Sequence, residues 1–168
     1  MMQRSIIFFG ILFGILLIIY VRLLDVSEVI YSDGWGRYLG YLAVLILPLS
    51  IFFTLRQIRL HSGPTSFFRT VSIAAQVAII ASTVYCVYMW SDIQFFNASH
   101  LENTFKYEAL EMKLAGHSDE DVSSRLKKLK EHYFSASPYI NTYTMYLAMG
   151  LVYGCLFHLF FRIKKSNQ

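Results

Sequence analysis

The stretch VSIAAQVAIIASTVYCVYMW, from Val71 to Trp90, contains twenty residues and no charged side chain. An α-helix rises about 1.5 Å per residue, so about 20 residues cross the roughly 30 Å hydrocarbon core of a bilayer. A helix of this length in a soluble domain normally carries a polar, charged face that meets water. Because this stretch carries no charge on any face, it predicts a membrane-spanning helix.

Three other uncharged apolar runs occur, at residues 5–21, 38–55 and 137–161. The composition agrees, since apolar residues make up 55% and charged residues 15% of the chain, against roughly 45–50% and about 25% in soluble domains. We therefore expect an all-α fold, a four-transmembrane-helix bundle that forms a single integral membrane domain over residues 1–168. The predicted spans are about residues 5–24, 38–55, 67–90 and 139–161. The apolar core of the first exceeds the about 7–15 residues of a secretory signal, which favours an uncleaved anchor.

Basic residues mark one side of this membrane arrangement. They occupy the N-terminus, the link between the second and third spans, and the tail, and these segments contain no Asp or Glu. The basic residues are Arg4, Arg56, Arg59, Arg69, Arg162, Lys164 and Lys165. Lys and Arg stay on the cytoplasmic side during insertion, so we expect both termini to be cytoplasmic. The net charge of +4 is then a topology signal and does not indicate nucleic-acid binding.

The segment between the third and fourth spans, residues 92–137, is polar and helically periodic. Two apolar stripes recur in it at spacings of three and four residues, which is typical of amphipathic helices. The stripes are Leu101, Phe105, Ala109 and Met112, and then Val122, Leu126, Leu129 and Tyr133. Gly116 predicts a helix end and Ser118 a helix cap, with Asp121 at the capping-box position. We expect an extracytoplasmic helical hairpin whose stripes pack together or lie on lipid.

Two pairs of glycines are spaced four residues apart within the predicted spans. They are Gly10 with Gly14, and Gly150 with Gly154. Small residues at this spacing let two membrane helices approach closely. These glycines either organise the bundle internally or mediate self-association, and the sequence leaves both open.

The residues that usually carry chemistry are sparse in this sequence. It contains no nucleophile motif, glycine-rich phosphate loop or paired-carboxylate arrangement. The external histidines lack the spacing of metal ligands. No Asp, Glu, Lys or Arg falls in the middle of a predicted span, which argues against a proton-coupled transporter. We therefore expect a non-enzymatic protein with no metal and no cofactor.

The segments IFFTLRQIR, SGPTSFFRTVSIA, ASTVYCVYMW, AGHSDEDVSSRL and YFSASPYI carry a family resemblance. Through them, nearly the whole chain resembles the four-span family catalogued as domain of unknown function 4199. Arg59 matches the family's basic position at the end of a span, Gly63 matches a glycine of the turn that follows, and Ser66 and Phe67 match the exit from that turn. The resemblance implies a Gram-negative inner-membrane protein with a periplasmic hairpin. It implies no activity, because the family is uncharacterised.

Two functions are compatible with these features. The first is an interaction or scaffold protein of the cell envelope whose partners are the lipid bilayer and either a second copy or another envelope protein. Its candidate interaction face is Leu101, Phe105, Val122, Leu126, Leu129 and Tyr133. The alternative is an oligomeric channel or permease for a small neutral solute, with a polar path lined by Gln76, Ser82, Thr83 and Thr142. On a helical wheel Gln76 and Thr83 share a face that excludes Ser82, which favours packing over a lumen.

Overall fold

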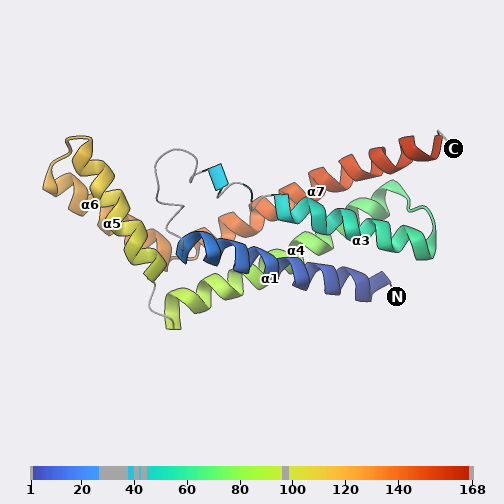
Figure 1. Cartoon of the computed structure of the whole chain (residues 1–168), viewed down its shortest axis with the longest axis horizontal. Coiled ribbons are helices and arrows are strands. Elements are labelled where there is room, and N and C mark those ends of the chain that lie inside the picture. Colours follow the sequence, from blue (N-terminus) through green and yellow to red (C-terminus); the bar gives the residue numbers. More distant parts are fainter. Residues whose placement is uncertain (1, 27–37, 40–41, 43–44, 96–98, 167–168) are drawn as a thin grey trace.

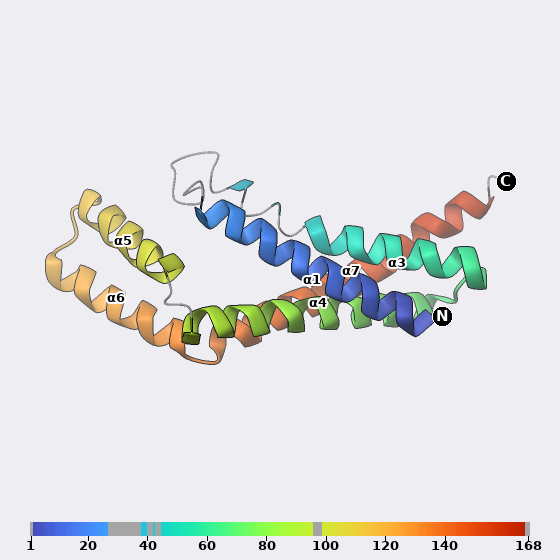
Figure 2. The same ribbon diagram turned by 60° about the horizontal axis from the view of Figure 1, so that its bottom comes forward.

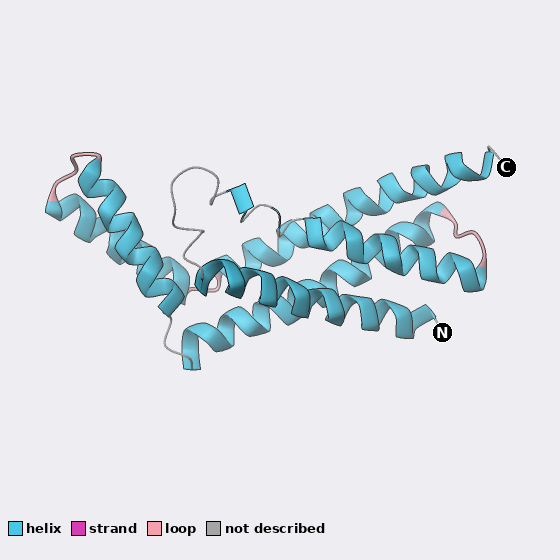
Figure 3. Ribbon diagram, viewed as in Figure 1, coloured by secondary structure: helices cyan, strands magenta, loops and turns pink. Residues whose placement is uncertain are grey.

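The computed structural model describes residues 2–26, 38–39, 42, 45–95 and 99–166. Within these residues the chain is all-α, as predicted, with six helices and no strand (Figure 3). The helices are α1 (Met2–Val26), α3 (Ile46–Ser62), α4 (Phe67–Phe95), α5 (Ser99–Leu114), α6 (Asp119–Phe134) and α7 (Ser137–Ser166). Helices α1, α3, α4 and α7 form a bundle along the long axis of the molecule, and α5 and α6 lie beyond one end of it (Figure 1).

Three helices of the described residues are long and apolar enough to cross a bilayer. They contain the candidate spans Met2–Leu24, Phe67–Ile93 and Ser137–Arg162. The shortest of the three has 23 residues. At about 1.5 Å per residue it exceeds the roughly 30 Å hydrocarbon core. These helices overlap the predicted spans at 5–24, 67–90 and 139–161.

The second predicted span, at 38–55, does not form a spanning helix of its own in the described residues, so the candidate spans are three and not four. Helix α3 begins at Ile46 and continues to Ser62, a length of 17 residues. Residues 40–41 and 43–44 lie outside the described part of the chain. The helix ends later in the chain than the uncharged apolar run, because it continues past Arg56 and Arg59. It ends only at Gly63, which has a φ of 74° and donates its N–H to the Arg59 carbonyl.

Helix α4 is the centre of the bundle and contacts α1, α3 and α7. Its inward face consists largely of small and β-branched residues that are almost fully buried. The buried set on α4 is Ile73, Ala74, Val77, Ala78 and Ala81, and that on α3 is Leu47, Ile51, Leu55 and Ile58. Helix α3 therefore belongs to the core of the bundle even though it is the shortest of the four helices.

The outward faces of the bundle are apolar as well. Exposed side chains on α1, α4 and α7 include Ile7, Phe8, Ile15, Val87, Val152 and Leu156. A bundle surrounded by water would place polar residues at such positions, whereas a lipid-facing surface takes apolar ones. The outer surface is therefore the kind that a membrane protein presents to lipid.

The first glycine pair faces α4 of the same chain. A Cβ atom placed on Gly10 would lie 2.7 Å from Cγ2 of Ile80, and one placed on Gly14 would lie 2.8 Å from Cβ of Val84. Both distances are too short for ordinary carbon contacts, whose optimum is about 3.5–4.0 Å. Helix α1 therefore approaches α4 at a distance that only glycine permits at these two positions.

The second glycine pair brings α7 against a different face of α4. A Cβ atom on Gly150 would lie 2.6 Å from Cβ of Ala78, and one on Gly154 would lie 3.0 Å from Cβ of Ala74. The Cβ atom placed on Gly150 would also lie 3.2 Å from the backbone carbonyl oxygen of Ala74. Backbone meets backbone here with almost no side chain between, as in other close crossings of membrane helices.

An ion pair joins α1 to α4 near the end of the bundle that adjoins α5 and α6. Nη2 of Arg22 lies 2.9 Å from Oδ1 of Asp92, and the two side chains are 37% and 11% exposed. The guanidinium carbon of Arg22 also lies 5.9 Å from the ring centroid of Tyr88. The charge of Arg22 is thus matched by a carboxylate and an aromatic face at the same end of the bundle.

Helices α6 and α7 are separated by only two residues, Ser135 and Ala136. The Ser135 N–H donates to the His132 carbonyl, and its hydroxyl accepts a hydrogen bond from the N–H of Ser137. The Ala136 carbonyl accepts a hydrogen bond from the N–H of Ile140, which lies in the first turn of α7. Both sides of this short link are therefore hydrogen-bonded to a helix end.

Replacing Gly150 by leucine should destabilise the bundle by about 1–3 kcal/mol, the usual cost of overpacking. The new side chain would have to displace Ala78 or the α4 backbone. Ala148, which is exposed on the same helix, provides the matched control Ala148→Leu. Thermal unfolding of the purified protein in detergent measures both. Equal melting temperatures for the two variants would contradict the close approach of α7 and α4.

Candidate functional site

Helices α5 and α6 lie side by side and run in opposite directions, and we call them the α5–α6 pair (Figure 2). The turn between them depends on Gly116, which has a φ of 82°. The Gly116 N–H donates to the Lys113 carbonyl and the His117 N–H donates to the Met112 carbonyl. These two hydrogen bonds form a Schellman motif, which ends a helix with glycine in the left-handed conformation. Gly116 is thus the helix end that its sequence position predicts.

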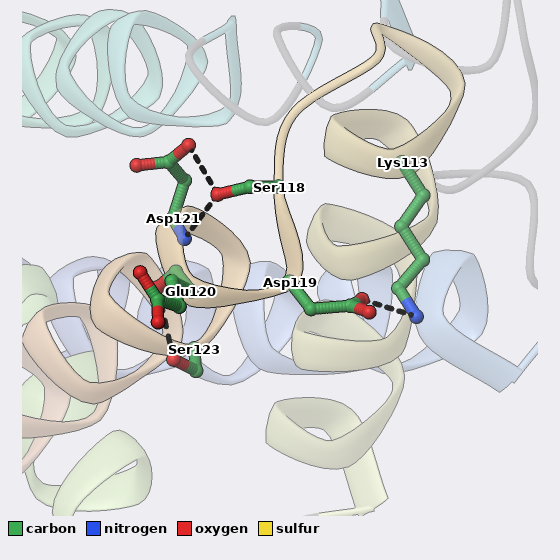
Figure 4. A network of polar contacts seen from close by, with 6 residues as sticks. All are labelled: Lys113, Ser118, Asp119, Glu120, Asp121 and Ser123. Atoms are coloured by element: carbon green, nitrogen blue, oxygen red, sulfur yellow. Dashed lines mark hydrogen bonds and ion pairs between the residues drawn. The ribbon is translucent and has the colours of Figure 1, made fainter.

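Ser118 caps the start of α6, as its sequence position predicts (Figure 4). Its hydroxyl accepts the N–H of Asp121 at 3.2 Å and donates to Oδ2 of the same residue at 2.6 Å. Hydrogen bonds from the Ser118 side chain and backbone lower the pKa of the Asp121 carboxyl. Across the turn, Nζ of Lys113 lies 3.1 Å from Oδ1 of Asp119. The acidic first turn of α6 is therefore used for capping and for pairing with α5.

The predicted interaction face lies largely where α5 and α6 meet. Val122 is buried, and the other α6 members of the face and Phe105 are half-buried. The rings of Phe105 and Tyr133 are 6.1 Å apart between centroids. Burial raises the pKa of the Tyr133 hydroxyl, and the nearby Glu108 carboxylate acts in the same direction. The half-buried members are Phe105, Leu126, Leu129 and Tyr133; the side chain of Leu101 lies outside the described residues.

A polar contact closes the α5–α6 pair on one side. Nε of Arg125 donates to Oε1 of Glu108 at 3.0 Å, and the two side chains are 56% and 30% exposed. Exposed ion pairs of this kind contribute about 0–1 kcal/mol. The aromatic and aliphatic contacts between the helices therefore outweigh this ion pair in holding them together.

Among the described side chains of the α5–α6 pair, three large apolar ones are exposed. Leu110, Leu114 and Phe134 are 53%, 79% and 53% exposed. The stripe predicted on α5 does not include the two leucines, because they lie outside its spacing of Leu101, Phe105, Ala109 and Met112. Their own separation of four residues is the signal that indicates a second apolar face.

The four residues of the predicted family turn come together between α3 and α4. Arg59 lies in the last turn of α3, Gly63 ends the helix, and Phe67 begins α4. The hydroxyl of Ser66 accepts the N–H of Arg69 at 3.4 Å. The carbonyl of Ser66 accepts the hydroxyl of the buried Thr70 at 2.9 Å. Ser66 thus organises the first turn of α4.

Two aromatic contacts fasten this turn to the end of α7. The guanidinium carbon of Arg59 lies 4.6 Å from the ring centroid of Phe161. The rings of Phe67 and His158 are 5.3 Å apart and nearly perpendicular. These contacts join residues at least 91 positions apart in the chain, and contacts at such separations leave no local sequence pattern that could predict them.

The polar residues proposed to line a path do not share one surface. Gln76 and Thr83 are exposed on α4, whereas Ser82 is fully buried inside the bundle and Thr142 is half-buried on α7. The Gln76 amide donates to the hydroxyl of Ser72 at 3.1 Å. The hydroxyls of Thr83 and Ser82 donate to a backbone carbonyl of the same helix. A single chain therefore offers no continuous polar lining among these four residues.

Groups suited to metal or thiol chemistry are dispersed. Among the residues that the structure describes, no three His, Cys, Asp or Glu side chains gather where they could hold a metal ion. Cys86 and Cys155 are free thiols, one on α4 and the other on α7. The candidate functional features are therefore surfaces, namely the α5–α6 pair and the end of the bundle at the α3–α4 turn.

Replacing Ser118 by alanine should weaken the first turn of α6 by about 1 kcal/mol, the usual cost of losing a helix cap. Loss of the hydroxyl should also raise the pKa of Asp121 toward its ordinary value. A lowered carboxyl pKa stabilises the fold above the unfolded-state pKa and stops doing so as the pH falls through the folded-state pKa. The variant should therefore lose less stability on acidification.

Hydrogen exchange of the Asp119–Asp121 amides and an NMR titration of the Asp121 carboxyl measure these effects. Ser118→Thr keeps a hydroxyl and serves as the control. Unchanged exchange together with an unchanged Asp121 pKa in the alanine variant would contradict the cap.

Comparison with known proteins gives one result. The family model described as a protein of unknown function, DUF4199, matches residues 8–162, which include α3, α4, the turn between them, the α5–α6 pair and most of α1 and α7. No curated protein and no solved structure matches the chain significantly. Because the match covers most of its length, this chain is a member of the DUF4199 family.

Proposed function

We propose that this chain is a non-enzymatic, multi-pass protein of the bacterial inner membrane that binds another envelope protein through the α5–α6 pair. In this proposal α1, α4 and α7 cross the membrane, and α3 packs against them in the bundle. The observation that carries the proposal is the pair of exposed leucines, Leu110 and Leu114, one turn apart at the end of α5 beyond the bundle.

The distribution of charge supports a periplasmic location for the α5–α6 pair. Both chain ends and the α3–α4 turn lie at one end of the molecule, and the pair lies at the other (Figures 1 and 2). Arg4, Arg56, Arg59 and Arg69 belong to the first end. Because Lys and Arg near spanning helices are retained in the cytoplasm, the basic end is assigned to the cytoplasmic side.

The use of polar groups in the α5–α6 pair supports binding rather than catalysis. The carboxylates of Glu108, Asp119 and Asp121 each have a hydrogen-bond or ion-pair partner within the pair. Apolar side chains on a polar, solvent-facing element lose contact with water when a partner covers them. That burial contributes about 25 cal/mol for each Å² of apolar area.

The double substitution Leu110→Ser with Leu114→Ser should abolish a specific cross-linked complex formed from the pair in intact cells. The matched control is Lys127→Ser with Lys128→Ser, which changes two exposed side chains of α6 and should leave the complex unchanged. Leu126→Asp with Leu129→Asp should instead unfold the pair, because those leucines are half-buried. Circular dichroism distinguishes loss of binding from loss of helix. Equal cross-linking by the serine variant and the control would count against the proposal.

The outer face of α4 favours a second candidate, an oligomeric channel for a small neutral solute. Ser72, Gln76 and Thr83 are exposed on one side of a spanning helix. The Gln76 amide has one hydrogen bond, to Ser72, within the described residues. Leaving the other amide groups in hydrocarbon costs several kcal/mol. Parallel copies in one membrane place Gln76 at the same depth, where the amides can pair with one another.

In a Cys86→Ala, Cys155→Ala background, Gln76→Cys should form a disulfide-linked dimer if α4 lies at an interface between copies. Val152→Cys, which is exposed on α7, is the control and should remain monomeric. A channel should also release a neutral solute from liposomes, and Gln76→Leu should slow that release. Sealed liposomes and an uncross-linked Gln76→Cys protein would exclude this second candidate.

A further inference from the structure

A cavity of about 230 Å³ lies between the first turns of α1 and the last two turns of α3. It is lined by Met2, Arg4, Ser5, Gln57, Ile58, His61 and Ser62. Five of these seven residues are polar, and they include an arginine, an amide and two hydroxyls. The cavity lies at the end of the bundle that carries the α3–α4 turn (Figure 1).

Several polar groups of the lining are available to a ligand. Within the described residues, the Arg4 guanidinium has no hydrogen-bond or ion-pair partner. Nδ1 of His61 lies 2.9 Å from the Gln57 carbonyl oxygen. Because a carbonyl only accepts, Nδ1 carries the proton of that contact, and Nε2 of the neutral ring is a hydrogen-bond acceptor. The cavity therefore presents a permanent positive charge and further hydrogen-bonding groups.

The surroundings of the cavity contain positive charge without compensating carboxylates. Residues 1–24 and 34–91, which include the cavity lining and the α3–α4 turn, contain no Asp or Glu. Nη2 of Arg69 lies 3.0 Å from Sδ of Met2, so a second guanidinium touches a residue of the lining. A concave surface lined by charge of one sign concentrates ligands of the opposite sign. The chemistry of the cavity thus selects an anion.

We propose that this cavity binds a phosphate-bearing anion, either the headgroup of an anionic phospholipid or free inorganic phosphate. Guanidinium groups match phosphate oxygens in a bidentate geometry, and hydroxyl and amide groups donate to the remaining oxygens. Pockets for drug-sized ligands measure about 300–1,000 Å³, so this smaller cavity suits a compact group. The site lies at an end of a spanning helix, where phospholipid headgroups are found. This inference is independent of any partner bound by the α5–α6 pair.

The test compares lipid retention by the full-length protein extracted from nanodiscs. Native mass spectrometry should detect phosphatidylglycerol bound to the wild-type protein and less phosphatidylcholine. The double variant Arg4→Gln with His61→Gln should bind phosphatidylglycerol about 10-fold more weakly, since the charge-assisted hydrogen bonds of the Arg4 guanidinium are lost. The control Lys127→Gln with Lys128→Gln removes two charges from α6 and should retain lipid as the wild type does.

A second variant and a second ligand make the test decisive. Gln57→Glu places a carboxylate in the cavity and should abolish binding of either anion, and an unchanged melting temperature verifies its fold. Isothermal titration with inorganic phosphate in a zwitterionic detergent, against chloride at equal ionic strength, distinguishes the two sources. If inorganic phosphate binds and its binding requires Arg4, the ligand is free phosphate. If the protein retains phosphatidylglycerol but does not bind inorganic phosphate, the ligand is the lipid headgroup. Binding of neither, or binding unaffected by all the cavity variants, would overturn the proposal.

Discussion

The close approach of α1 and α7 to α4 is the constraint on which the rest of the structure depends. In lipid there is little hydrophobic drive to bring apolar helices together, so association relies on contact at short range. Gly10 and Gly14 provide that contact on α1, and Gly150 and Gly154 provide it on α7. The small residues of α4 complete both surfaces. With α4 held on two sides, α3 packs its buried face into the same core and the two ends of the bundle acquire defined surfaces.

Those two ends differ in chemistry. At one end, basic side chains surround the α3–α4 turn, and aromatic contacts from Arg59 and Phe67 hold that turn to α7. At the other end, Arg22 is paired with Asp92, and the α5–α6 pair extends the structure with mixed charge. The interior between the ends contains mainly apolar side chains and hydroxyls bonded to backbone carbonyls of their own helix. Charged side chains are therefore concentrated at the ends of the bundle.

Local sequence patterns predicted the features whose causes are local. Runs without charge located α1, α4 and α7, and Gly116 and Ser118 located the turn between α5 and α6. The bounds of α3 were not predictable in this way. An uncharged run shows which residues are apolar enough to lie in lipid, but a helix can continue beyond that run into charged residues, as α3 does at Arg56 and Arg59. Contacts between distant residues, such as Arg22 with Asp92, leave no periodic signal. The apolar stripes of α5 and α6 are visible in the sequence, but which surface each one meets depends on how the helices pack.

The connection between α6 and α7 has a mechanical consequence. Only Ser135 and Ala136 separate the two helices, and hydrogen bonds brace both sides of that joint. A change in the orientation of α6 should therefore also change the orientation of α7, because the link between them is short and hydrogen-bonded. The close contact of Gly150 and Gly154 with α4 is the point about which α7 would tilt. A tilt of α7 would therefore also move Phe161 and its contact with Arg59, at the other end of the bundle.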